Sequence, residues 1–160
     1  MTWLPLLLAL TLLMHEMGHL VAAKVLRLPT RGLRFAMRPI PHLYVSVSYY
    51  RLTLRRRVIF LLSGSVPVVV MLIAFATLGR PYRDVHLALS IQTIVDTNPF
   101  FSDYVVSIMS CLYRREFSQT GANEVVLREL KERYFFSPVW YIHFVTWGVV
   151  IALLISGVFL

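Results

Sequence analysis

Two histidines and a glutamate stand close together near the start of the chain, in the string His15-Glu16-Met17-Gly18-His19. Their spacing is that of the H-E-x-x-H motif. On a helix, residues four apart share a face, so His15 and His19 can bind one metal ion together. Glu16 lies one residue further round the helix, where it can hold a water beside that ion without being a ligand. The motif therefore predicts a zinc site with its own general base.

The motif lies inside a long apolar stretch, which runs from Trp3 to Leu26. A helix of this length and composition can cross a bilayer. A charged side chain at the centre of a membrane helix costs about 2.5 kcal/mol or more, so Glu16 is expected to have a partner or a chemical task. The placement predicts a metal site at membrane depth.

The composition also indicates an integral membrane protein. The chain has 160 residues, of which 58% are hydrophobic, and its mean hydropathy is +0.68. The net charge is +8, and the basic residues cluster in the loops between apolar segments. This pattern is typical of cytoplasmic loops beside anionic lipid, so we expect no nucleic-acid partner. A single cysteine permits neither an internal disulfide nor a thiolate metal site.

Four apolar segments are predicted to be transmembrane helices in one α-helical domain that covers residues 1–160. Each offers about 20 residues, enough for the hydrocarbon core of a bilayer, and they are 3–26, 58–78, 85–112 and 139–160. The loops 27–57 and 113–138 carry most of the arginines, so the positive-inside rule places both in the cytoplasm and both termini outside. We expect a multi-pass protein of a prokaryotic cytoplasmic membrane.

The two long loops are predicted to contain structure of their own. In the membrane-associated loop 27–57, residues 43–50 alternate in the manner of a strand and can pair with residues 33–37 as a β-hairpin. The alternative is an interfacial loop without fixed strands. In the amphipathic loop 113–138, residues 122–133 are predicted to form a short helix on the membrane surface.

A third metal ligand must come from elsewhere, because a catalytic zinc usually has three protein ligands and one open position. Asp103 matches in depth: the motif ends about 24 Å along the first segment and Asp103 lies about 27 Å along the third, at 1.5 Å per residue. Asp96, about 10 Å shallower, stays an alternative ligand because Asn98-Pro99 interrupts the helix. His86 and His143 are interpreted as interfacial histidines.

Taken together, these features resemble the site-2 protease family of intramembrane zinc metalloproteases, in a minimal form. The resemblance rests on H-E-M-G-H in a first membrane helix, a β-like loop after it, a small-residue and proline stretch at 63–67, and Asn98-Pro99 followed by Asp103. It covers residues 7 to 106. The chain has Tyr104 directly after Asp103, where the family usually has glycine.

The resemblance implies a zinc metalloendopeptidase that hydrolyses a peptide bond in or near a membrane segment of a protein or peptide substrate. It implies one Zn²⁺ ion bound by His15, His19 and Asp103. Glu16 would take a proton from the attacking water and return it to the leaving amine. Asn98 would bind the substrate backbone or the developing oxyanion. The edge of the hairpin offers a place where an unwound substrate strand can pair.

Two other functions stay open. One is a non-proteolytic metal-binding membrane protein or accessory scaffold, although polar residues concentrated at one depth favour a single site over a transport path. The other is a small toxin, immunity or accessory membrane protein in which the motif is coincidental. Besides the lipid bilayer and a substrate, the small size makes a second copy of the chain or another membrane protein an expected partner.

Overall fold

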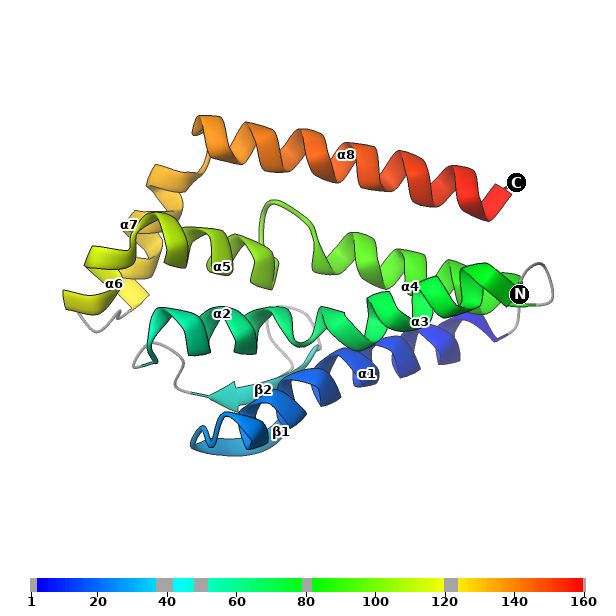
Figure 1. The fold of residues 1–160 in the computed structure, drawn as a ribbon, viewed down its shortest axis with the longest axis horizontal. Coiled ribbons are helices and arrows are strands. Elements are labelled where there is room, and N and C mark those ends of the chain that lie inside the picture. The colour runs from blue at the N-terminus through cyan, green and yellow to red at the C-terminus, as the bar shows by residue number, and fades with distance from the viewer. Residues whose placement is uncertain (1–2, 37–41, 48–51, 79–81, 120–123, 160) are drawn as a thin grey trace.

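The structure, a computed structural model, describes residues 3–36, 42–47, 52–78, 82–119 and 124–159. It is mostly helical, with a two-stranded sheet after the first helix (Figure 1). The elements in chain order are α1 (Leu4–Val25), β1 (Thr30–Ala36), β2 (His42–Val47), α2 (Leu54–Leu62), α3 (Ser65–Leu78), α4 (Arg83–Asp96), α5 (Asp103–Leu112), α6 (Arg114–Gln119), α7 (Glu124–Tyr134) and α8 (Pro138–Phe159).

Two helices, α1 and α8, are each long and apolar enough to cross a membrane. α2 and α3 together are also long and apolar enough to cross a membrane, if the pair is counted as one span with a bend of 42°. The predicted second segment is therefore present but interrupted, between Leu62 and Ser65. Over the residues that the structure describes, two or three spans replace the four that we expected.

The predicted third segment, 85–112, is found as two shorter helices. It consists of α4 and α5, which are separated by a turn from Thr97 to Ser102. The interruption predicted at Asn98-Pro99 is confirmed. Pro99 has no N–H to continue the helical ladder, and its ring keeps the residue before it out of helical geometry.

The predicted β-hairpin is confirmed for the residues that can be compared. β1 and β2 pair antiparallel, with Leu33 opposite Val45, and the register shifts at a bulge near the start of β1. Gly32 lies at this bulge with φ +74°, a backbone conformation that glycine adopts without steric cost. The predicted turn and the end of the predicted second strand lie outside the described residues.

The helices pack in a way that brings both interruptions together. α1 packs against α3, α4 and β2, while α2 packs against α5. α8 packs against α4 and lies on the side of α4 away from α1 (Figure 1). The breaks between α2 and α3 and between α4 and α5 therefore both lie beside the middle of the molecule, where α1 passes.

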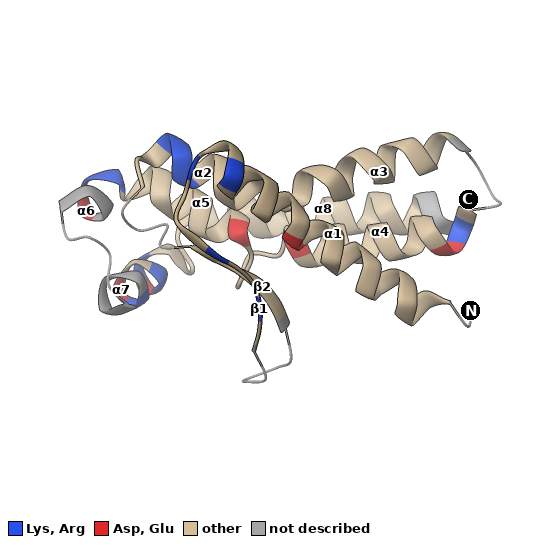
Figure 2. Cartoon of the chain, turned by 90° about the horizontal axis from the view of Figure 1, so that it is seen from below, with Lys and Arg blue, Asp and Glu red and all other residues tan. Residues whose placement is uncertain are grey.

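Charged residues gather at one end of the molecule. Figure 2 shows Lys and Arg mainly on α2, α6 and α7, with others on the hairpin and, beside Asp84, at the start of α4 at the other end; the long apolar helices carry few charges. Under the positive-inside rule, the end with α2, α6 and α7 is predicted to be cytoplasmic. We expected the helix that is now α7 to lie with its apolar side on the membrane surface, but Leu130 and Tyr134 are buried in a cluster with α5 and α8.

Candidate metal centre

His15 and His19 lie on one face of α1 and point their Nε2 atoms at each other and at Asp103. The two Nε2 atoms are 3.1 Å apart. Asp103 Oδ2 lies 2.9 Å from the Nε2 of His19 and 3.7 Å from that of His15. The three side chains form a group that could hold a metal ion, with their ligand atoms all within 4.8 Å of one another.

The outer ring nitrogens show which nitrogen carries the proton. His19 Nδ1 lies 2.8 Å from the backbone carbonyl of Phe60, which can only accept, so Nδ1 donates and Nε2 keeps its lone pair. His15 Nδ1 lies 3.0 Å from Asp96 Oδ2 and donates in the same way. Metal-binding histidines are usually oriented by such outer hydrogen bonds to a carboxylate or a backbone carbonyl.

When each ring is neutral and protonated on Nδ1, the two Nε2 atoms and Asp103 Oδ2 are three acceptors at short separations. Their mutual repulsion is then relieved by a shared proton or by a bound cation. Zinc accepts this donor set in tetrahedral geometry, and bonds of about 2.0–2.1 Å would place its ligand atoms about 3.3 Å apart. The separations of 2.9, 3.1 and 3.7 Å are close to this spacing, so the three residues could hold a metal ion.

Asp96, the alternative ligand, is placed behind His15 rather than in the group. Its Oδ2 accepts from His15 Nδ1, and its Oδ1 accepts from Gln92 Nε2 at 2.7 Å. Both oxygens are therefore engaged with donors away from the three ligand atoms. Asp96 thus has a different task from that of Asp103, namely to hold the ring of His15 in place.

Asp103 reaches the histidines because of how α5 starts. Ser102 is the N-cap of α5, and its hydroxyl accepts from the N–H of Val105. Serine at this position satisfies a backbone donor that the helix cannot. Asp103 is then the first residue of α5, and Tyr104 follows it within the first helical turn. Tyr104 therefore has helical backbone geometry, which a residue other than glycine adopts without strain.

Asn98 uses its side chain to build the turn between α4 and α5. Its Oδ1 accepts from the N–H groups of Phe100 and Phe101 at 3.0 and 2.9 Å, and its Nδ2 donates to the carbonyl of Val95. Asn98 is buried and is not one of the three converging residues. The predicted contact of Asn98 with a substrate is not tested and stays a prediction.

Glu16 is buried on α1 beside the two histidines. Its Oε2 has no hydrogen-bond partner among the described residues, and the backbone of Val45 in β2 lies near enough to the carboxylate to interact with it. A buried carboxylate oxygen without a donor is costly, which is what we expect of a group whose partner is a water or a substrate. Glu16 is therefore a buried acid, next in sequence to His15, with one carboxylate oxygen that lacks a donor among the described residues.

Two glycines allow the α2–α3 break to approach the ligand atoms. A Cβ at Gly64 would lie 2.4 Å from Nε2 of His19 and 2.7 Å from Nε2 of His15. A Cβ at Gly18 would lie 2.3 Å from the carbonyl oxygen of Ser63. We noted the small-residue stretch at 63–67 in the sequence but did not predict that Gly64 contacts the two histidine rings. Gly18, inside H-E-M-G-H, was the one sequence feature that could have indicated the close approach of this stretch to α1.

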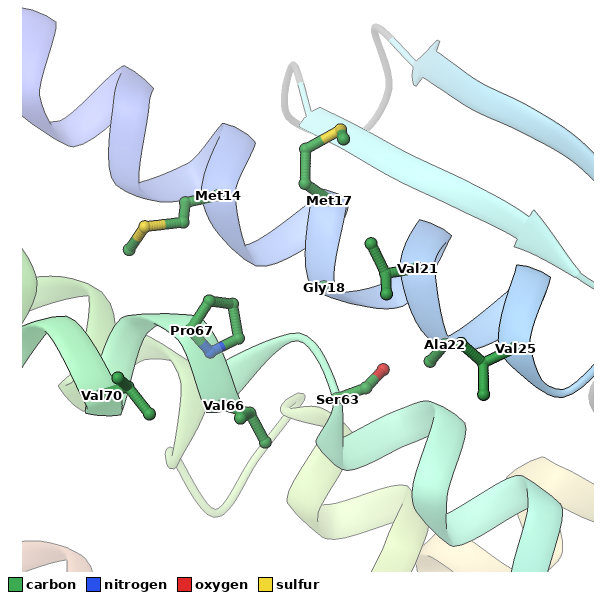
Figure 3. A pocket seen from close by; sticks show the side chains of 10 residues that line it. All are labelled: Met14, Met17, Gly18, Val21, Ala22, Val25, Ser63, Val66, Pro67 and Val70. Atoms are coloured by element: carbon green, nitrogen blue, oxygen red, sulfur yellow. The ribbon is translucent and has the colours of Figure 1, made fainter.

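An apolar groove of about 490 Å³ lies between α1 and the α2–α3 break. Figure 3 shows Met14, Met17 and Val21 on one side of it and Val66 and Pro67 on the other. Helical spacing puts this lining on the side of α1 away from Glu16. The groove is almost entirely apolar, and none of His15, His19 and Asp103 lines it.

Comparison of the chain with protein-family models, with curated protein sequences and with solved structures found no match. The site is therefore interpreted from its own residues.

Proposed function

We propose that this protein is an intramembrane zinc metalloendopeptidase similar to the site-2 proteases, which hydrolyses a peptide bond in or near a membrane segment of a protein or peptide substrate. One observation carries the proposal. Ligand atoms from His15, His19 and Asp103 converge next to Glu16, whose Oε2 has no hydrogen-bond partner in the part of the chain that the structure describes. A site built only to store or carry a metal has no use for that fourth group.

Each residue has a role in hydrolysis. His15, His19 and Asp103 would hold the zinc, which supplies a Lewis acid that polarises a carbonyl and lowers the pKa of a bound water. Glu16 Oε2 accepts a proton from the attacking water as its oxygen bonds to the peptide carbon. When the C–N bond breaks, Glu16 returns this proton to the leaving nitrogen, so the carboxylate is restored.

β2 is the element best placed to align the substrate. Because β2 packs against α1 and the backbone of Val45 lies near the Glu16 carboxylate, this strand passes beside the site. An extended peptide that pairs along the edge of β2 would bring its own peptide bonds next to Glu16, in the manner of β-strand addition. A transmembrane substrate must therefore unwind locally before it is cut.

The membrane setting follows from the helices that carry the site. Glu16 and both histidines lie on α1, one of the two helices long and apolar enough to span a bilayer alone. We propose a multi-pass location in a cytoplasmic membrane of the prokaryotic type, with the basic end facing the cytoplasm. Substrate and lipid are the expected partners, and a second copy or another membrane protein is compatible with the small size.

The test is a Glu16→Gln variant, purified in parallel with the wild type and reconstituted in liposomes with a panel of single-span membrane reporters. The glutamine side chain keeps the shape of glutamate but cannot take a proton, so cleavage should fall by about 10²–10⁴-fold while zinc content stays at one ion per chain. Glu129→Gln, at an exposed residue of α7, is the matched control and should cleave normally.

Two results would contradict the proposal. Cleavage by the Glu16→Gln variant at the wild-type rate would exclude Glu16 as the base. A wild type that holds zinc but cuts no reporter would favour the non-proteolytic metal-binding alternative.

A further inference from the structure

The break between α4 and α5 deprives several backbone carbonyls of their helical donors. In a continuous helix, Ile94 would accept from the N–H of Asn98 and Thr97 from the N–H of Phe101. The first N–H donates to Val95 instead, and the second donates to the Asn98 side chain. A carbonyl without a donor is especially costly in an apolar setting, so these carbonyls need donors from another element.

α8 supplies those donors from one face. Residues 140, 143 and 147 are three, four and seven apart, so their rings lie along the same side of the helix. Each ring N–H reaches a different carbonyl: Trp140 Nε1 donates to Pro99 at 3.1 Å, His143 Nε2 to Thr97 at 3.0 Å and Trp147 Nε1 to Ile94 at 2.9 Å. Three hydrogen bonds therefore join α8 to the break between α4 and α5.

His143 also connects this break to α7. Because a carbonyl can only accept, Nε2 of His143 must carry the proton that bonds to Thr97. Nδ1 then has a free lone pair and accepts from the hydroxyl of Tyr134, 2.8 Å away. The hydroxyl of Tyr134 thus fixes the tautomer in which His143 can hold the break.

We propose that α8 is a positioning element for the metal centre, with His143 as its central positioning residue. Only a short turn separates Pro99 from Asp103. If the turn between α4 and α5 were mobile, the carboxylate of Asp103 could move away from the histidines on α1. Trp140 and Trp147 share the task, one at each side of His143. The inference rests on the proposed metal site but assigns α8 no ligand and no contact with substrate.

The proposal is tested with two readouts on protein purified in detergent micelles. Hydrogen–deuterium exchange of the amides of residues 98–106, in metal-free protein, reports on the break itself. Titration with Co²⁺, followed by its visible absorption, reports on the ligand set. The variants are His143→Leu, which removes both hydrogen bonds, His143→Gln, which can replace both, and Trp147→Phe, which removes one ring N–H and keeps the bulk.

In the His143→Leu variant, exchange of the Phe100 and Phe101 amides should rise about tenfold, as expected when one hydrogen bond to a buried carbonyl is lost. Co²⁺ affinity should fall by at least about tenfold, the usual effect of disturbing the support of a ligand. His143→Gln should restore both. Thr146→Leu is the control, because its exposed hydroxyl bonds only within α8, and it should change neither.

Wild-type exchange and wild-type Co²⁺ affinity in both His143→Leu and Trp147→Phe would overturn the proposal. Faster amide exchange with unchanged Co²⁺ affinity in His143→Leu would also overturn it. That result would show that α8 stabilises the break but does not position Asp103 for metal binding. A wild type that binds no Co²⁺ is a distinct result, which refutes the proposed function instead.

Discussion

Asp103 and Asp96 offer the sharpest test of the metal centre, because both carboxylates contact the same histidine from opposite sides. Asp103 Oδ2 faces Nε2 of His15 and His19, whereas Asp96 Oδ2 accepts from Nδ1 of His15. Replacing each by alanine should therefore weaken metal binding in two different ways. The first change removes a ligand, and the second removes only the support of a ligand.

The magnitudes follow from these contacts. Asp103→Ala leaves two protein ligands, fewer than the three or four of zinc sites in proteins, so zinc content should fall from about one ion per chain to nearly none. Asp96→Ala removes one hydrogen bond to a carboxylate, worth about 1.5–3 kcal/mol. That loss corresponds to roughly 10- to 100-fold in affinity, so the variant should still bind one zinc ion when the metal is in excess.

The assay is metal analysis of the purified variants, followed by competition against a zinc chelator of known affinity. Asp84→Ala is the control, because Asp84 lies in the first turn of α4, at the opposite end of that helix from Asp96. Full zinc content in Asp103→Ala would refute the ligand set. The same conclusion would follow if Asp96→Ala lost its zinc at saturating metal while Asp103→Ala kept it.

Three further predictions concern packing, capping and ionisation. Gly64→Ala should lower Co²⁺ affinity at least about tenfold in a titration, because the new methyl group would lie 2.4 Å from Nε2 of His19; Gly148→Ala, where a Cβ meets nothing within 4 Å, should not. Ser102→Ala should lower the free energy of unfolding by about 1 kcal/mol through loss of the α5 cap, measured by denaturant titration, whereas the exposed Ser156→Ala should have little effect. Burial raises the pKa of Tyr134 from 10.0 to about 12, so the folded state favours the neutral phenol. The stability that this provides is complete below about pH 10 and is lost as the pH rises toward about 12; unfolding curves at about pH 9 and about pH 11 should show a smaller loss for Tyr134→Phe, and an equal loss would contradict the assignment.

The parts of this structure that are local in sequence were predictable. The i, i+4 spacing of His15 and His19 placed both rings on one face before any fold was known. The break at Asn98-Pro99 follows from the missing N–H of proline, and the hairpin follows from alternation of side chains. Asp103 was chosen by its depth along a segment that proves to be two helices, and the structure nevertheless brings it to the histidines.

The parts that depend on contacts between distant segments were not predictable in the same way. A carboxylate such as Asp96 has the same chemistry whether it binds a metal or holds a histidine ring, and only the direction of that ring decides between the two. Gly64 borders the ligand atoms because α2 and α3 bend there, and no single-residue pattern gives such an angle. We predicted His143 to be an interfacial histidine. No local pattern indicates the hydrogen bonds of the α8 rings, because they join positions more than 40 residues apart.

The attachment of the break to α8 has a consequence for the order in which the protein is assembled. A ribosome delivers residues 94–99 to the membrane well before residues 140–147, and chains fold largely in that order. During this interval His15, His19 and Asp103 are all present, but the carbonyls beside them lack the ring donors of α8. The nascent protein thus contains all three proposed ligands before α8 has formed its hydrogen bonds to the break. The three ligands would therefore reach their final positions only after the last helix has docked.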